Sequence, residues 1–189
     1  MVQETHERTL LLLKPDAVER GLIGECITRF EQRGFSICGL KLIHANEAMM
    51  REHYKENANN PEWLKRVGTN TIEAFTNSNR DPHAELGTTD VQAVGKMGID
   101  WLVSFMTSGP IVAIVISGQH AVEMVRKVVG HTMPMKADIG SIRGDYSVDS
   151  PITAALEKRT VQNFIHASGT REEAESEIKH WFTDEELCA

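Results

Sequence analysis

The chain has 189 residues, of which 41% are hydrophobic and 25% are charged, a composition typical of one soluble globular domain and not of a disordered segment. Its formal net charge of -7 argues against a general affinity for nucleic acid or for an anionic membrane, because such binding normally shows as a basic excess. An anionic substrate would therefore need a local cluster of positive charge.

Three cysteines, Cys26, Cys38 and Cys188, are odd in number and lack C-x-x-C spacing, which favours neither a disulfide framework nor a thiolate zinc site. The histidines show no H-E-x-x-H pattern, so no metal held by the protein itself is expected. Residues 1–9 are polar, and the longest apolar runs are too short to cross a bilayer. We therefore expect a cytoplasmic protein in a reducing setting.

The first half of the chain alternates buried-strand and amphipathic-helix patterns. These patterns predict a strand at 9–13, a helix at 22–33, a strand at 35–45 and a short helix at 47–56 that carries Tyr54. The first strand is stopped by Lys14-Pro15, because proline cannot donate to a sheet, and this brings the lysine amine to a strand end. A polar, glycine-containing stretch at about 69–99 is interpreted as a surface insertion.

The second half continues the alternation and contains a long irregular stretch. Its patterns predict a strand at 111–117, a helix at 120–129, a strand at 162–167 and a final helix opened by a capping box of Thr170 and Glu173. Residues 130–145 contain three glycines without periodicity, which indicates a structured loop of the kind that carries function. The alternation fits either a doubly wound parallel sheet or an α+β sandwich, and periodicity does not choose between them.

Cations at the ends of elements, together with one histidine, are the candidates for chemistry. Lys14, Arg126 and Arg143 are the cations, and His166 ends a short strand just before a helix start, where backbone amides stabilise negative charge. Each has an ordinary structural interpretation, such as a surface lysine or a salt-bridged arginine. A lone histidine in this position is more often structural than catalytic.

A series of short motifs, in one order over nearly the whole chain, resembles the nucleoside diphosphate kinases. They are Lys14-Pro15-Asp16, Arg20-Gly21-Leu22-Ile23-Gly24-Glu25, Arg29-Phe30-Glu31, Gly34-Phe35, Glu52-His53-Tyr54, Ser108-Gly109-Pro110, Gly130-His131-Thr132-Met133-Pro134, Ile142-Arg143-Gly144-Asp145, Asn163-Phe164-Ile165-His166-Ala167-Ser168 and Trp181-Phe182. Each of these short strings alone is weak evidence, because such a string can arise by chance. Their occurrence in one order over a single domain is specific to the family.

The resemblance implies an α+β fold, a ferredoxin-like sandwich whose four-stranded antiparallel sheet is covered by helices. It implies one domain over 1–189 with insertions at about 69–99 and 147–159. The implied activity is transfer of the γ-phosphate of a nucleoside triphosphate to a nucleoside diphosphate, by a ping-pong mechanism through phospho-His166. Mg²⁺ bound with the nucleotide and a homo-oligomer, either a hexamer or a tetramer, are also implied.

The resemblance also assigns roles by position. It makes His166 the nucleophile and places Glu172 on its other ring nitrogen, where the carboxylate fixes tautomer and orientation. The remaining implied roles are Lys14 and Tyr54 beside the nucleophile and the migrating phosphate, Lys14 and Asn163 on the sugar hydroxyls, and Arg126, Thr132 and Arg143 on the phosphates. A ring of cations suits a loose phosphoryl transition state.

Two departures from the family pattern stand out. Gly169 occupies a position where many relatives carry aspartate three residues after the histidine, and a changed helix cap is expected there. Glu62 follows Pro61 where the base-stacking aromatic usually stands, so Trp63 is predicted to replace that ring after a one-residue shift. Two alternatives stay open: a nucleotide-binding module without turnover, and an interaction protein that works through the insertion.

Overall fold

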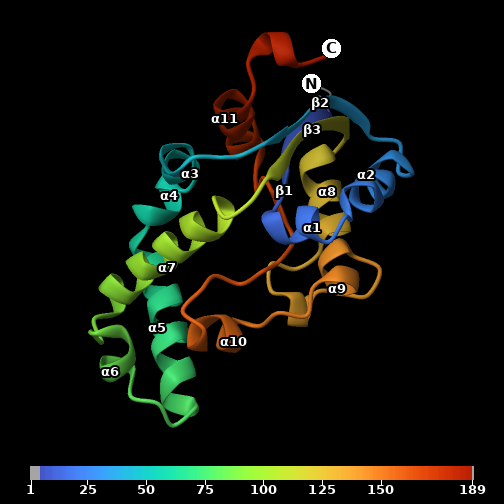
Figure 1. Ribbon diagram of the computed structural model, residues 1–189. Helices are drawn as coiled ribbons and strands as arrows, with labels where there is room; N and C mark the ends of the chain where they lie inside the picture. Colours follow the sequence, from blue (N-terminus) through green and yellow to red (C-terminus); the bar gives the residue numbers. More distant parts are fainter. Residues whose placement is uncertain (1–4, 189) are drawn as a thin grey trace. The chain divides into compact units, whose positions relative to one another are not determined.

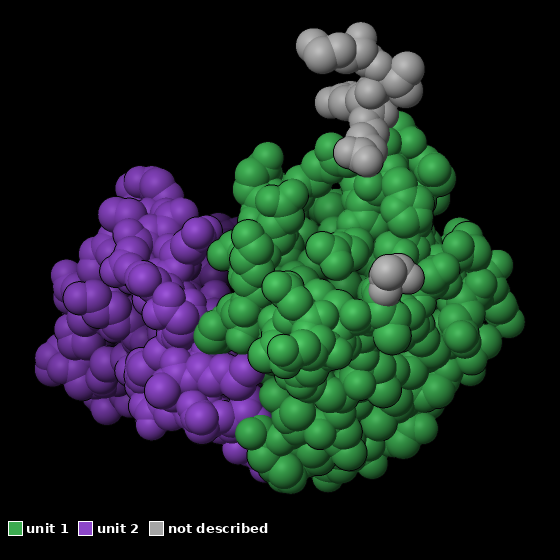
Figure 2. Space-filling view, turned by 90° about the horizontal axis from the view of Figure 1, so that it is seen from above, with its two compact units in different colours: residues 1–44, 109–148, 163–189 green, residues 45–108, 149–162 purple. Residues whose placement is uncertain are grey.

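The structure, a computed structural model, describes residues 5–188, so the first four residues of the polar amino-terminal stretch lie outside it. The chain divides into two compact units, which Figure 2 distinguishes by colour. We call residues 1–44, 109–148 and 163–189 unit 1, and residues 45–108 and 149–162 unit 2. The prediction of a single domain with two insertions runs across both units and stays a prediction.

Unit 1 is built on a four-stranded sheet. The strands are β1 (His6–Leu13), β2 (Ser36–Ile43), β3 (Ile111–Gln119) and β4 (Ile165–Ala167), in the spatial order β2-β3-β1-β4. Every neighbouring pair is antiparallel, and β1 pairs with β4 in a register that sets Leu12 opposite His166. The α+β sandwich is therefore confirmed, and the doubly wound parallel alternative is wrong.

Helices cover both faces of this sheet, as Figure 1 shows. Leu11 and Leu13 join a core with α2 (Ile23–Glu31) and α8 (Ala121–Val129). Leu10 and Leu12, which alternate with them along β1, are equally buried but face the other side. The last helix, α11 (Arg171–Trp181), packs against β1 there. Because Leu12 pairs with His166, the histidine lies on the α11 face.

Short helices in unit 1 follow local sequence signals. They are α1 (Pro15–Glu19), η1 (Pro134–Lys136), α9 (Ile142–Tyr146) and η2 (Asp184–Glu186). Pro15 starts α1 directly after Lys14, where its missing N–H costs no hydrogen bond. The stretch 130–145, predicted as a structured loop, contains η1 and most of α9, and Ser141 caps α9 by accepting from the Gly144 N–H.

The predicted capping box at the start of α11 forms only in half. The Thr170 side chain accepts from the Glu173 N–H, as predicted. The Glu173 carboxylate, however, accepts at 2.6 Å from the N–H of Gly169, one residue earlier than the box requires. Its oxygen lies 2.6 Å from the point where a Cβ of residue 169 would stand, so only a glycine leaves room for this arrangement.

All regular secondary structure in the described part of unit 2 is helical. Its helices are α3 (Glu47–His53), α4 (Lys55–Ala58), α5 (Pro61–Asn77), α6 (Pro82–Leu86), α7 (Val91–Met106) and α10 (Pro151–Leu156). Residues 69–99, expected as a polar surface insertion, form the second half of α5, α6 and the first half of α7. The long helices approach closely because Gly68 and Gly95 have no Cβ to meet the facing backbone. No helix within residues 5–188 is long and apolar enough to cross a membrane.

Candidate active site

The backbone of the candidate site contains a strained turn at Phe164, immediately before β4. Phe164 has φ of 72°, and the Ile165 N–H donates across it to the Asn163 carbonyl at 2.8 Å, which is a γ-turn of the rare, positive-φ kind. Such a conformation costs about 1–3 kcal/mol and persists only when neighbours hold it. Here the Asp16 carboxylate accepts from the Phe164 N–H at 3.1 Å, and the Lys14 N–H donates to the Phe164 carbonyl at 3.0 Å.

The turn places His166 against a buried carboxylate. Nε2 of His166 lies 2.9 Å and 3.1 Å from the two carboxylate oxygens of Glu177, which projects inward from α11. Ser168 also donates its hydroxyl to Glu177 at 2.6 Å, and its own oxygen accepts from the Leu10 N–H at 3.3 Å. A carboxylate at Nε2 favours the neutral tautomer with its proton there, and this tautomer carries its lone pair on Nδ1.

The carboxylate partner expected from the family resemblance must be corrected from Glu172 to Glu177. Glu172 is exposed in the first turn of α11, where a backbone hydrogen bond, followed by the Thr170 hydroxyl, lowers its pKa. Five residues along a helix correspond to more than one full turn, so Glu172 and Glu177 point in different directions. Glu177 lies on the inward stripe with Ala174 and Trp181, which is why it reaches the imidazole.

Lys14 and Asn163, predicted to act together, are hydrogen-bonded to each other. Lys14 Nζ donates to Asn163 Oδ1 at 2.6 Å, and Asn163 Nδ2 donates to the carbonyl of Thr132 at 2.9 Å. Lys14 is buried, and desolvation, assisted by the positive charge of Arg143, lowers its pKa from 10.5 to about 8. With a pKa of about 8, the Lys14 side chain is mostly charged at pH 7 and loses its proton with a small rise in pH.

Arg143 is buried and fastened to the backbone around the site. Its Nε donates to the Asn163 carbonyl at 3.0 Å, Nη1 to the Gly130 carbonyl at 2.9 Å and Nη2 to the Ile165 carbonyl at 2.5 Å. A guanidinium has five N–H donors in a fixed plane, so these bonds orient it rigidly. Arg143 thus joins the loop after α8 to the turn before β4 and holds a fixed positive charge near Lys14.

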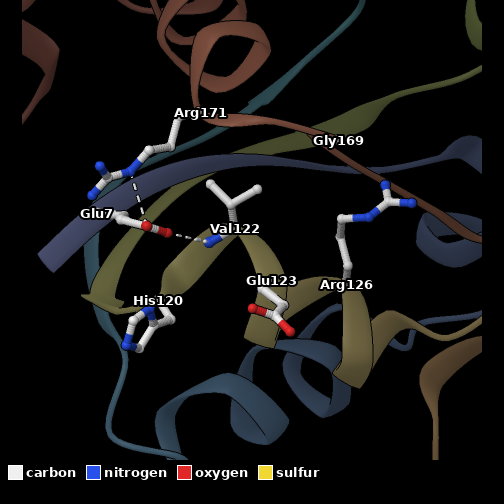
Figure 3. Close-up of a pocket in the computed structure, with 7 residues that line it drawn as sticks. All are labelled: Glu7, His120, Val122, Glu123, Arg126, Gly169 and Arg171. Atoms are coloured by element: carbon white, nitrogen blue, oxygen red, sulfur yellow. Dashed lines mark hydrogen bonds and ion pairs between the residues drawn. The ribbon is translucent and has the colours of Figure 1, made fainter. Parts of the chain in front are cut away.

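Arg126 is exposed at the end of α8, and Figure 3 shows it at one end of a surface pocket of about 320 Å³. At the other end, Arg171 pairs with Glu7 at 2.9 Å, and Glu7 also accepts from the Val122 N–H. Nη1 of Arg126 lies 3.8 Å from the position of a Cβ on Gly169. A side chain at position 169 would therefore stand beside this arginine, and in this chain Glu173 brings its carboxylate to that place instead.

Tyr54 and Trp63 belong to unit 2. Tyr54 is buried where α3 meets α4, and the predicted helix at 47–56 is interrupted at this residue. Trp63 is half-buried in the first turn of α5, where the Asn60 side chain caps the helix by accepting from the Glu62 and Trp63 N–H groups. Their predicted places beside the nucleophile and the base stay predictions.

Three residues that shape the site were missed from sequence: Asp16, Ser168 and Glu177. A signal existed for Glu177, because a glutamate on the apolar stripe of a helix must find a buried partner. Asp16 and Ser168 gave no such signal, since their roles depend on strands that are distant in sequence. Burial raises the pKa of Asp16, while its oxygens accept from the Ala17 and Phe164 N–H groups.

Comparison with known proteins decides the family. The family model described as nucleoside diphosphate kinase matches residues 7–74 and 91–187. The chain belongs to the nucleoside diphosphate kinase family. A relative of that name from Pyrobaculum aerophilum is 49% identical over 181 residues, covering 96% of this chain and 97% of the relative. Another from Roseiflexus sp. is 36% identical, covering 96% of this chain and 91% of the relative.

Solved structures agree with this assignment. A crystal structure of the NDP kinase from Pyrobaculum aerophilum has a TM-score of 0.88 at 46% identity, covering 97% of this chain and all of that one. A Borrelia burgdorferi nucleoside-diphosphate kinase, described as a transition-state mimic with bound vanadate and ADP, has a TM-score of 0.75 at 28% identity, covering 98% of this chain and 92% of that one. Phosphoryl transfer between nucleotides, expected from the motifs, is therefore confirmed as the reaction of this chain.

Proposed function

We propose that His166 carries the phosphoryl group between nucleotides on its Nδ1 atom. In the first half-reaction the Nδ1 lone pair attacks the γ-phosphorus of a nucleoside triphosphate, the bond to the β,γ-bridging oxygen breaks, and a nucleoside diphosphate leaves. In the second half-reaction a terminal phosphate oxygen of another diphosphate attacks the phosphohistidine and the N–P bond breaks. The observation that supports this assignment is the 2.9 Å contact between Nε2 and Glu177, which keeps the proton on Nε2 and leaves the lone pair on Nδ1.

Glu177 is proposed to keep the ring oriented and to stabilise the positive charge that the imidazole acquires on phosphorylation. The carboxylate needs no proton transfer for this role, because it acts through charge and hydrogen bonding. Ser168, which donates to the same carboxylate, holds it in place. This arrangement parallels other catalytic histidines whose second nitrogen is fixed by a carboxylate.

The cations are proposed to bind the phosphates. Lys14 and Arg143 face the migrating group, Thr132 and Arg126 bind further phosphate oxygens, and Asn163 with Lys14 binds the sugar hydroxyls. Tyr54 is proposed to lie beside the nucleophile, and Trp63 to stack on the base. The support for this set is the chain of hydrogen bonds from Lys14 through Asn163 to Thr132, since cationic and polar groups that are held in place before the substrate arrives suit an anionic ligand.

Mg²⁺ is proposed to arrive with the nucleotide. The two carboxylates of the unit 1 site do not form a cage for it, because Asp16 accepts from backbone N–H groups and Glu177 accepts from His166 and Ser168. A magnesium ion coordinated by phosphate oxygens and water fits such a site, since Mg²⁺ keeps much of its hydration in nucleotide complexes. There it would offset phosphate charge.

The decisive experiment labels the protein with ATP carrying a radioactive γ-phosphate. We expect an acid-labile, alkali-stable phosphoenzyme, discharged by any nucleoside diphosphate, and loss of labelling in His166→Ala. His44→Ala, which removes an exposed histidine at the end of β2, is the matched control and should label normally. Label that persists in His166→Ala would assign the phosphate to another residue and overturn the proposal.

Two further proposals concern location and assembly. From the composition and the cysteine pattern we propose that the chain works in the cytoplasm, and from the family resemblance that it assembles as a homo-oligomer, either a hexamer or a tetramer. Sedimentation equilibrium of the purified protein measures the assembly directly, and a monomer at micromolar concentration would refute it. The insertion is proposed to serve the surface or a subunit contact and not the chemistry. Within it, residues 75–90 are the part that the family model leaves unmatched.

A further inference from the structure

The carboxyl-terminal segment, residues 182–188, runs along the edge strand β2. Phe182 and Leu187 pack over Gly39, where a Cβ would lie 3.0 Å and 2.9 Å from their side-chain carbons. Glu186 pairs with Lys41 at 2.7 Å. Two apolar contacts and one ion pair thus lay this segment along the strand, with residue order opposite to that of β2. The segment consequently ends beside the residue that precedes Gly39.

Two cysteines meet where the carboxyl-terminal segment ends: Cys38, which precedes Gly39 in β2, and Cys188 in the segment. The Cys188 N–H donates to the Cys38 carbonyl at 2.6 Å. Given standard backbone bond lengths, such a contact keeps the two Cα atoms within roughly 6.5 Å of each other. Disulfides join cysteines whose Cα atoms lie about 4.4–6.8 Å apart. The fold therefore brings these two residues, distant in sequence, into the range of a covalent cross-link.

The thiol of Cys38 points to the side on which the carboxyl-terminal segment lies. The ladder between β2 and β3 is irregular between Ile37 and Gly39, so Cys38 is the extra residue of a β-bulge. Its Sγ lies 3.2 Å from Ser117 Oγ. Because Ile116 belongs to the core under α2 and α8, Ser117 points to the opposite face of the sheet, and Cys38 points with it.

The third cysteine does not compete for either partner. Cys26 lies in α2 and belongs to the core on the other face of the sheet, where burial raises the pKa of its thiol to about 12. Cys188 is exposed, so a dissolved oxidant reaches it first, whereas Cys38 is buried next to it. An exposed thiol beside a buried one is the arrangement in which attack by a reagent is followed by resolution within the molecule.

We propose that Cys38 and Cys188 form a reversible intramolecular disulfide that fastens the carboxyl-terminal segment to β2. The oxidant is a low-molecular-weight disulfide. The Cys188 thiolate attacks it, forms a mixed disulfide and releases one thiol; the Cys38 thiolate then displaces the second. Two cysteine thiols are thereby oxidised by two electrons, the small disulfide is reduced to two thiols, and these thiols take up the two protons.

The cross-link is expected to stabilise the fold without changing phosphoryl transfer. It closes a loop of about 150 residues, so the loss of chain entropy in the unfolded state predicts a rise in melting temperature on the order of 10 °C. β2 and β4 are opposite edges of the sheet, which separates the pair from His166 by two intervening strands. Failure of this proposal would leave the phosphohistidine proposal untouched, and the reverse also holds.

The test treats the full-length protein with oxidised glutathione under native conditions, blocks remaining thiols with N-ethylmaleimide, and maps the peptides without reduction. We expect one linked pair containing Cys38 and Cys188, a blocked Cys26, and a monomer band on a non-reducing denaturing gel. Cys188→Ser and Cys38→Ser should lose both the link and the gain in melting temperature. Cys26→Ala, the matched control, should keep both, even if its starting melting temperature is lower.

Other results would overturn the inference. Three blocked thiols after oxidation would show that the two sulfurs do not meet in solution. A link recovered only from a dimer band would show that it joins two chains, and a link that includes Cys26 would show that the fold opens before oxidation. Equal melting temperatures for oxidised and reduced protein, with the link present, would refute its role as a fastening for the carboxyl-terminal segment.

Discussion

Lys14 offers the sharpest test of how this site is built, because the structure predicts that its charge opposes folding. Burial lowers its pKa from 10.5 to about 8, and a difference of that size corresponds to roughly 3 kcal/mol. Below pH 8 the lysine is charged in both the folded and the unfolded protein, and the folded state bears the full penalty. Between pH 8 and 10.5 only the unfolded lysine holds its proton, so the penalty is progressively removed.

The variant Lys14→Met keeps the length of the side chain and removes the charge. It also removes the donor to Asn163, which shifts the stability of the variant by an amount independent of pH. The pH dependence therefore isolates the charge. As pH rises from 7 to about 10.5, the unfolding free energy of the wild type should increase relative to that of Lys14→Met by roughly 3 kcal/mol.

Urea unfolding at fixed protein concentration, repeated at pH 7, 8, 9 and 10, measures this difference, and other titrating groups cancel between the two proteins. Lys127→Met, which removes an exposed lysine of α8, is the control and should follow the wild type in parallel. Parallel curves for the wild type and Lys14→Met would refute the reasoning, because they would show that the ammonium is not desolvated in the folded state.

Two further predictions test the carboxylate partner and the helix pair of unit 2. Glu177→Gln should lower kcat about 10- to 100-fold, because the amide lacks the charge and pairs badly with one of its two donors, His166 and Ser168. Glu172→Gln, the control, should keep kcat within about twofold of the wild type. Equal losses of kcat in steady-state exchange assays would reinstate Glu172 as the partner. Gly95→Ala should cost about 1–3 kcal/mol, since its Cβ would lie 2.7 Å from the carbonyl carbon of Leu64, while Gly24→Ala, open on all sides in α2, should be neutral or slightly stabilising. Equal changes in melting temperature for Gly95→Ala and Gly24→Ala would contradict the predicted clash at Gly95.

Local patterns predicted the strands and longer helices of unit 1 well, because the spacing of apolar residues in each element follows the side that is buried. They did not predict α5, α6 and the first half of α7, which occupy the stretch interpreted as a surface insertion. The apolar run at 9–13, the amphipathic pattern at 22–33 and the Thr170 cap all correspond to elements of unit 1. The direction of strand pairing was not readable from these patterns, since parallel and antiparallel sheets share one side-chain period. Only the ordered family motifs decided that question.

What the sequence did not disclose depends on contacts between distant residues. The γ-turn at Phe164 exists because Asp16, at the start of α1, accepts its N–H. No local propensity predicts a bulky residue at positive φ. The capping box failed for a related reason, because the Glu173 carboxylate accepts from the Gly169 N–H, and the missing side chain of Gly169 leaves room for it. Cys38 and Cys188 likewise become neighbours only through the docking of the carboxyl-terminal segment.

An acidic protein that handles polyanions must hold its positive charge in place before the substrate arrives. Arg143 is fixed by three carbonyls and Lys14 by Asn163, so little side-chain entropy remains to be lost when phosphate binds. This fixed arrangement also strains the backbone at Phe164 and removes the Lys14 ammonium from water, and both effects lower the free energy of unfolding. Substitutions that relieve them, Lys14→Met above all, are therefore expected to weaken phosphoryl transfer even where they raise the free energy of unfolding. A Lys14→Met variant with undiminished exchange activity would separate the two properties and would remove Lys14 from the transition state.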